Sequence, residues 1–151
     1  MPTLQSEYLF TVRMAVDELH DFGETPFGTR HVDMLGEGSF EGPKLKGKVL
    51  GGMDQKIFRP DGAMTPNVRL VLNTDDDALI YMQYTGLRYG SEEVMDRIAK
   101  GETVDPSEYY LRNTPYFETS APQYDWLNRI VSVGVGRRMP DHAAYDIFQI
   151  L

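Results

Sequence analysis

Residues Gly36 to Gln55 read GEGSFEGPKLKGKVLGGMDQ and hold six of the chain's 14 glycines. The glycines recur at short intervals among residues that favour strands, such as Phe40 and Val49. In a helix each glycine would cost about 1 kcal/mol relative to alanine, so the stretch predicts short, sharply bent strands. A sheet that bends repeatedly can curl into a barrel, and the interior of a barrel must be filled by side chains or by a ligand.

Alternating apolar and polar residues predict further strands on both sides of this stretch. These strands are expected at residues 8–16, 29–35, 55–59, 68–73, 79–89, 109–119, 130–138 and 143–151. Segment 17–28 contains Pro26 and two glycines, and predicts a loop or a short helix followed by a loop. Together the segments predict an all-β fold, an antiparallel β-barrel of about eight to ten strands, formed by residues 1–151 as a single domain.

One short surface helix is predicted after Ser91, which is a suitable N-cap residue. An acidic residue, Glu92, follows in the first turn, and Gly101 stands where a helix would end. Val94 and Ile98 are four residues apart, so they would share the one apolar face of an otherwise polar helix. We therefore expect this helix to lie on the barrel surface or over one of its open ends.

The charge of the chain argues against several classes of partner. Lys and Arg number 15 against 23 Asp and Glu, which gives a net charge of −8. Binding to nucleic acid or to an anionic membrane surface requires a basic stripe, and the basic residues here are scattered, so neither partner is expected. No apolar run is long enough to span a membrane, and the N-terminus does not resemble a secretory signal.

The chain contains no cysteine and three histidines. Disulfides, thiolate catalysis and cysteine-ligated metals are therefore excluded, and a cytoplasmic location is expected. The histidines are far apart in sequence and lack metal-ligand spacing, so no metal site is predicted. The chain also lacks a phosphate-binding loop and a nucleophile elbow.

Several motifs, taken in order, cover nearly the whole chain. They are GTR at 28–30, GSFEGP at 38–43, LKGKVLGGMD at 45–54, NVRLVLNTDDDALI at 67–80, PYFET at 115–119 and YDWLN at 124–128. This set resembles the DUF3237 family, also called UPF0311. The resemblance implies an antiparallel barrel similar to those of allene oxide cyclase and dirigent proteins, which handle hydrophobic small molecules.

Two residues depart from the pattern of the family that the chain resembles. Gln55 stands where the family usually has tryptophan, and Asn67 stands where it usually has aspartate. If these positions face the cavity, the pocket of this chain is less acidic and differs in shape from those of relatives. The substrate of a relative would then not transfer directly to this chain.

Candidate catalytic residues lie in or next to the family-like motifs. Asp54, Arg69 and Tyr84 are predicted to be catalytic. A carboxyl group in an apolar barrel has a raised pKa and can exchange protons with a substrate, while an arginine stabilises an enolate or phenolate and a tyrosine protonates a leaving oxygen. The alternatives are a structural ion pair for Asp54, which could also tie down a glycine turn, and simple packing for Tyr84.

A second set of side chains is predicted to bind the substrate. It comprises Arg30, Phe40, Arg112, Tyr116, Phe117, Glu118, Trp126 and Asn128. Aromatic residues could line a pocket for a flat ligand, and the polar ones could lie at its rim. Alternatively, the aromatic residues fill the core or a subunit interface, and the polar residues cap turns.

The function that this pattern favours is a cofactor-independent lyase or isomerase, with acid–base chemistry on a small hydrophobic metabolite that is aromatic or carries a carbonyl group. No cofactor is expected. Two alternatives remain open: a non-catalytic barrel that binds a small ligand, and a structural or assembly role. Apolar strands at the surface of such a barrel also predict a homo-oligomer.

Overall fold

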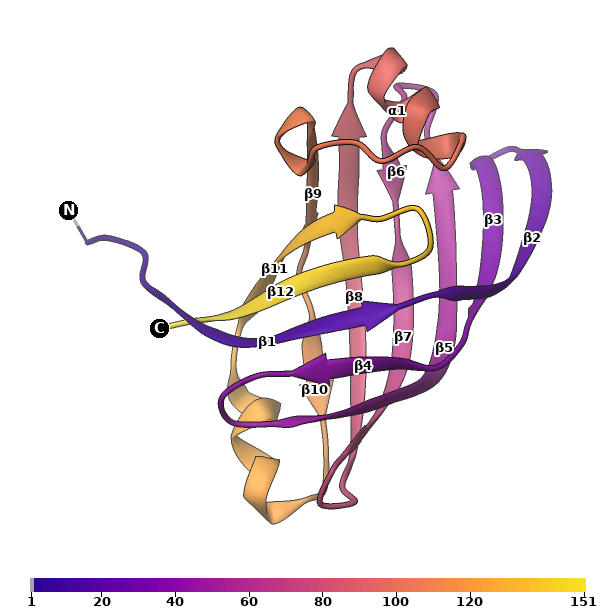
Figure 1. Cartoon of the computed structure of the whole chain (residues 1–151). Coiled ribbons are helices and arrows are strands. Elements are labelled where there is room, and N and C mark those ends of the chain that lie inside the picture. Colours follow the sequence, from indigo (N-terminus) through magenta and orange to yellow (C-terminus); the bar gives the residue numbers. More distant parts are fainter. Residues whose placement is uncertain (1) are drawn as a thin grey trace.

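The computed structural model describes residues 2–151, which form mainly antiparallel strands (Figure 1). The strands are β1 (Ser6–Met14), β2 (Val16–Thr25), β3 (Gly28–Leu35), β4 (Gly38–Glu41), β5 (Lys46–Phe58), β6 (Met64–Thr65), β7 (Asn67–Thr74), β8 (Leu79–Gly90), β9 (Tyr109–Asn113), β10 (Tyr116–Glu118), β11 (Ser132–Arg138) and β12 (Ala143–Ile150). The helices are α1 (Glu92–Ala99) and two 3₁₀ helices, η1 (Pro106–Glu108) and η2 (Pro122–Arg129).

The strand pairings close the sheet into a barrel. The circuit runs β5-β7-β8-β9-β11-β12-β1-β4 and returns to β5, and every pairing in it is antiparallel. In Figure 1, β1, β4, β11 and β12 cross in front of β5, β7 and β8. The predicted antiparallel β-barrel is therefore confirmed.

The glycine-rich stretch acts through β5, the longest strand. Gly51 has a φ of 141° and lies at a shift of register between β5 and β7. At Gly52, a Cβ atom would lie 1.9 Å from the backbone oxygen of Arg69 on β7. Glycine is thus required at one position for its backbone angle and at the next for close approach of a neighbouring strand.

Substituting Gly52 by alanine should destabilise the protein by about 1 to 3 kcal/mol, because the methyl group forces β5 and β7 apart. Urea unfolding of Gly52→Ala measures this loss. Leu50→Ala, at a half-exposed position on the same strand, is the control and should change stability by less than about 1 kcal/mol. Equal stability of Gly52→Ala and the wild type would contradict the proposed role of the close strand approach.

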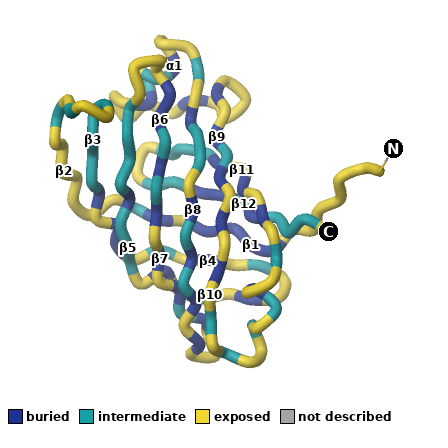
Figure 2. The backbone as a smooth tube through the Cα atoms, turned by 180° about the vertical axis from the view of Figure 1, so that it is seen from behind, coloured by how far each residue is buried: buried dark blue, intermediate teal, exposed yellow. Residues whose placement is uncertain are grey.

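The prediction of a loop or short helix over residues 17–28 is wrong, because most of this segment is strand β2, which pairs with β3. The β2–β3 hairpin extends from the barrel beside β5, and β2 is exposed along most of its length (Figure 2). A strand exposed on both faces needs no apolar alternation, which explains why the sequence pattern missed it. With β2, β3 and the short β6 and β10, the sheet has 12 strands.

The predicted surface helix is confirmed as α1. Ser91 caps its N-terminus, since its Oγ accepts a hydrogen bond from the Val94 backbone N–H at 3.2 Å. Val94 and Ile98 are buried, and Gly101 follows the helix with a φ of 78°. The helix lies at one end of the barrel (Figure 1). No helix within residues 2–151 has the length and apolar character needed to cross a lipid bilayer.

The β2–β3 hairpin carries several exposed apolar side chains. Leu19, Phe22 and Phe27 are more than half exposed there. Such residues are common at interfaces between subunits. The homo-oligomer expected from the sequence stays a prediction.

Candidate active site

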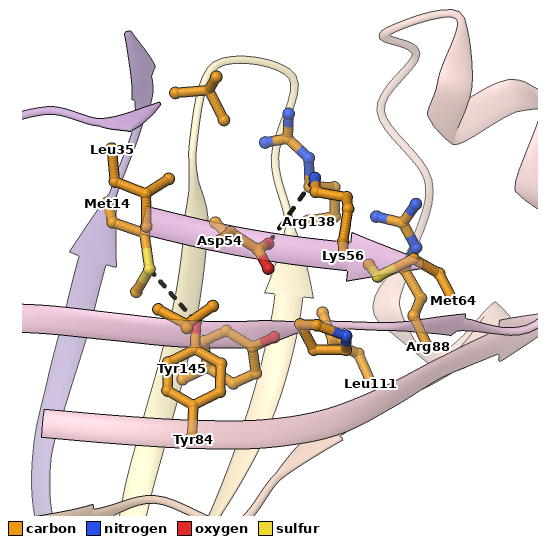
Figure 3. Close-up of a pocket in the computed structure, with 14 residues that line it drawn as sticks. Met14, Leu35, Asp54, Lys56, Met64, Tyr84, Arg88, Leu111, Arg138 and Tyr145 are labelled. Carbon is orange, nitrogen blue, oxygen red and sulfur yellow. Dashed lines mark hydrogen bonds and ion pairs between the residues drawn. The ribbon is translucent and has the colours of Figure 1, made fainter. Parts of the chain in front are cut away.

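A cavity of about 50 Å³ lies inside the barrel, near the end where α1 is located (Figure 3). Its polar lining consists of Asp54, Lys56, Tyr84, Arg88, Arg138 and Tyr145. The apolar lining consists of Met14, Val16, Leu35, Met64, Pro66, Val68, Leu111 and Ala143. The volume is sufficient for about three to five water molecules, or for one functional group of a larger ligand.

Strand register brings the polar residues onto the inner face of the barrel. Asp54 on β5 lies opposite Val68 on β7, and Val68 lies opposite Tyr84 on β8. Residues that pair across antiparallel strands share a face, and so do residues two or four positions apart on one strand. Lys56 therefore faces the cavity with Asp54, and Arg88 faces it with Tyr84.

Asp54 is the only carboxylate that lines the cavity within the described residues, and its side chain is buried. Its Oδ1 accepts a hydrogen bond from the Asn67 backbone N–H at 3.1 Å, and its Oδ2 lies 3.9 Å from the Lys56 Nζ. Burial raises the pKa of Asp54, and Lys56 and the Asn67 N–H oppose this rise only in part. A carboxyl group in this state is suited to accept and return a proton.

Two tyrosines face Asp54 from across the cavity. The rings of Tyr84 and Tyr145 have centroids 5.2 Å apart, and both residues are buried. Burial raises the pKa of each hydroxyl, so both remain protonated at neutral pH. The Tyr84 hydroxyl donates to the Met14 Sδ at 3.4 Å, and a thioether is a weak acceptor. This donor can therefore turn to a substrate oxygen at little cost.

Lys56 connects the cavity to a second buried carboxylate. Asp33 on β3 pairs in register with Asp54 and is fully buried. Its oxygens accept no hydrogen bond of good geometry from residues 2–151, and the Lys56 Nζ lies 2.7 Å from its Oδ2. The ammonium group is thus closer to Asp33 than to Asp54, which leaves the Asp54 carboxyl less neutralised.

Arg88 and Arg138 lie where the cavity meets a larger groove. This groove has a volume of about 740 Å³ and is lined by residues of β8, α1, β3 and the turn at Pro60–Gly62. Lys56, Arg88 and Arg138 line both spaces. Arg138 is anchored to the β11–β12 turn, because its Nη1 donates to the carbonyl oxygens of Met139 and His142 at 2.6 and 2.7 Å.

Of the three residues predicted to be catalytic, Asp54 and Tyr84 meet in the cavity. Arg69 does not, since its exposed side chain donates to the Asn67 Oδ1 at 3.1 Å. The side chain alternates outward on β7, which places it on the far side of the sheet from Val68.

The two arginines predicted to bind substrate also lie outside the cavity lining. Arg30 donates from its Nη1 to the Gln55 carbonyl oxygen at 3.1 Å. Arg112 donates to the Leu111 carbonyl oxygen at 2.9 Å and lies 4.9 Å from the centre of the Tyr110 ring. Both side chains are engaged by neighbouring parts of the sheet.

The aromatic residues predicted to bind substrate lie outside the cavity lining. Phe40 and Phe117 are buried and flank Phe10, with ring centroids 5.7 and 5.8 Å from it, so they fill the core. Tyr116 is half exposed on β10. Trp126 packs against the core cluster, and the Lys44 Nζ lies 5.4 Å from its ring centre. The placements of Phe40, Phe117 and Trp126 agree with the alternative of core packing.

The predicted polar rim residues also lie away from the cavity. Glu118 is exposed and lines a shallow depression on the outer wall. Asn128 stabilises a turn, since its Oδ1 accepts from the Thr119 N–H and its Nδ2 donates to the Thr119 carbonyl oxygen, each at 2.9 Å. Asn128 therefore fits the alternative in which the polar residues cap turns.

Four polar residues of the cavity were missed from the sequence: Lys56, Arg88, Arg138 and Tyr145. A signal existed for the first two, because Lys56 is two positions from Asp54 and Arg88 is four positions from Tyr84 on continuous strands. Tyr145 and Arg138 could not be found in this way. They enter the site only because β11 and β12 close the barrel opposite β5 and β8.

The fold and the cavity define a β-barrel with a buried polar pocket. The chain belongs to the family described as "Protein of unknown function (DUF3237)", whose model matches residues 4–150. A UPF0311 protein of Rhodopseudomonas palustris is 34% identical over 151 residues, which are 99% of each chain. Its crystal structure has a TM-score of 0.94 and covers 100% of both chains.

Two further solved structures are similar to this chain. A protein of Acinetobacter baumannii, described as beta-barrel like, is 37% identical with a TM-score of 0.86, over 100% of this chain and 98% of that chain. A protein described as an enzyme from Penicillium herquei has a TM-score of 0.73 over 100% of this chain and 98% of that chain. The identity to the Penicillium protein is 19%, so this likeness concerns the fold alone.

Proposed function

We propose that the protein is a cofactor-independent lyase or isomerase that acts by acid–base chemistry on a small hydrophobic metabolite, aromatic or carbonyl-bearing. The observation that carries this proposal is the placement of the buried Asp54, whose pKa is raised, opposite the hydroxyls of Tyr84 and Tyr145 in one cavity. A base and two neutral hydrogen-bond donors around one small space are the groups that enolisation requires.

In the proposed reaction the Asp54 carboxylate removes a proton from a carbon next to the substrate carbonyl. The electron pair of the broken C–H bond moves onto the carbonyl oxygen, which accepts a hydrogen bond from Tyr84 or Tyr145. Return of the proton to a different carbon gives an isomer. Loss of a β-substituent, which takes a proton as it leaves, gives the product of a lyase.

The dimensions of the site support a substrate larger than the cavity. A volume of about 50 Å³ admits one carbonyl or phenol group, and the adjoining groove of about 740 Å³ holds the remainder. Apolar residues are eight of the 14 that line the cavity, so electrostatic interactions are stronger there than in solvent. In the Penicillium herquei protein the same fold is described as belonging to an enzyme.

The test is incubation of the protein in heavy water with a panel of phenolic, enone and hydroxy-carbonyl metabolites, read by mass spectrometry. A new product or incorporated deuterium with at least one compound is expected. A compound that raises the melting temperature without any exchange would favour the non-catalytic binding barrel. If no compound is changed and none stabilises the protein, both functions are contradicted.

With the active compound, Tyr145→Phe is expected to slow exchange by about 100-fold, because a donor to the developing oxyanion is lost. Tyr84→Phe, whose hydroxyl lies near the same carboxyl group, should have an effect in the same direction. Tyr116→Phe is the matched control, since Tyr116 is half exposed on the outer wall and should leave the rate unchanged. Equal rates for Tyr145→Phe, Tyr84→Phe and the wild type would contradict the role of the hydroxyls.

A further inference from the structure

Arg88 is a buried cation that forms no ion pair with a carboxylate of residues 2–151. The residue is 6% exposed, and its Nε makes no hydrogen bond within the part of the chain that the structure describes. Among residues 2–151, no carboxylate lies within ion-pair distance of its guanidinium group. Burial lowers the pKa of Arg88 from its ordinary value. Burying an unpaired charge is costly, and arginine stays protonated even so, which points to a partner that arrives with the ligand.

Around the cavity, without the three acidic residues that line the groove, the charges leave an excess of one positive charge. Lys56, Arg88 and Arg138 carry positive charges at the junction of cavity and groove, and Asp33 and Asp54 carry the negative charges. Lys56 is held by Asp33 at 2.7 Å, and the Nη1 of Arg138 is held by backbone carbonyl oxygens. Arg88 therefore has the guanidinium group with the most free donors at this junction. The chain as a whole has a net charge of −8, so this site differs in sign from its surroundings.

We propose that the site takes a substrate that carries a carboxylate, which Arg88 binds at the junction of the cavity and the groove. The planar guanidinium group offers two parallel N–H donors that match the two oxygens of a carboxylate. The excess of one charge matches a monoanion. A phosphate, with close to two charges, fits less well, because Asp61, Glu92 and Asp96 also line the groove.

This inference rests on the proposed function for the placement of the substrate, and it deepens that function. With its carboxylate at Arg88, a substrate can extend its carbonyl or aromatic end toward Asp54 and Tyr145 (Figure 3). Arg88 then fixes which carbon of the substrate faces the base. Its role is to bind and position, while Asp54 moves the proton.

The test compares carboxylates with their neutral carboxamides. Benzoate, phenylacetate and cinnamate are each paired with the corresponding amide, and binding at millimolar concentration is measured by the shift in melting temperature and by calorimetry. At least one carboxylate is expected to bind about tenfold to hundredfold more tightly than its amide, because charge-assisted hydrogen bonds are lost in the amide. Equal binding within all pairs, or no binding by any carboxylate, would overturn the inference.

Variants of Arg88 provide a readout that needs no ligand. Arg88→Met removes an unpaired buried charge, so the melting temperature of the free protein is expected to rise by about 2 to 4 °C, while carboxylate binding is lost. Arg88→Lys should keep weaker binding. Arg69→Gln, which changes an exposed arginine on the outer face, should leave both measurements unchanged. A lower melting temperature for Arg88→Met together with unchanged carboxylate binding would contradict the inference.

The outcomes also separate this inference from the proposed function. If carboxylates bind in a way that depends on Arg88 but no deuterium is exchanged, the carboxylate site is supported and the proposed catalytic function is contradicted. If exchange is as fast with neutral substrates as with carboxylates and is unchanged in Arg88→Met, the catalytic function is supported and the carboxylate site is contradicted.

Discussion

Asp54→Asn is expected to slow deuterium exchange in the active substrate by about 100-fold to 10,000-fold, the usual effect of losing a general base. The melting temperature should change by no more than about 4 °C. Asparagine has nearly the shape of aspartate, and its carbonyl oxygen can still accept the hydrogen bond from the Asn67 N–H. The variant therefore removes the base and keeps the local structure.

Two measurements decide whether Asp54 has this role. Asp125→Asn is the control, because Asp125 on η2 pairs with Arg129 on the surface and lines neither the cavity nor the groove. Its exchange rate should equal that of the wild type. If Asp54→Asn unfolds far more easily than the wild type and keeps its exchange rate, Asp54 is a structural residue and the proposed mechanism fails.

The pH dependence of the same variant gives a second test. Burial raises the pKa of Asp54 above its ordinary value of 3.8. Ionisation therefore costs more in the folded state than in the unfolded state, and this cost appears as pH rises from about 3.8 through the raised pKa. Asp54→Asn should gain stability relative to the wild type over that interval, measured by urea unfolding. The exchange rate of the wild type should fall as pH decreases through the raised pKa, because the base becomes protonated.

The barrel could be predicted from the sequence because each of its strands is marked by residues close together in the chain. Glycines at 51 and 52 mark the bend in β5, and alternation marks most of the strands that form the closed circuit. Strand β2 was not predicted, because it is exposed on both faces and its sequence shows no alternation of apolar and polar residues. Local patterns describe a strand well when one of its faces is buried.

The site was predicted less completely because its residues come from strands that are far apart in the sequence. Asp54 and Tyr84 were selected as polar residues in or next to family-like motifs, and both line the cavity. Arg69 was predicted to be catalytic, but it is one position from Val68 on β7, and neighbouring residues of a strand point to opposite faces, so it lies outside the cavity. Tyr145 meets Tyr84 only through closure of the barrel, which no short sequence pattern encodes.

The largest expected loss of stability comes from Lys56→Met. Asp33 is fully buried, and the Lys56 ammonium at 2.7 Å is the one cation within ion-pair distance of it among residues 2–151. Removing one partner of a buried pair leaves an uncompensated charge, which costs about 3 to 5 kcal/mol. Urea unfolding at neutral pH measures this loss, and the methionine side chain retains most of the volume of lysine.

A matched control and a double variant identify the cause. Lys44 pairs with Glu7 at 3.1 Å on the surface, and Lys44→Met should cost less than about 1 kcal/mol because water screens exposed pairs. Adding Asp33→Asn to Lys56→Met should restore most of the lost stability, since the unpaired charge is then removed. If the double variant is no more stable than Lys56→Met alone, the loss comes from packing of the lysine stem, and the buried ion pair is not what stabilises this end of the barrel.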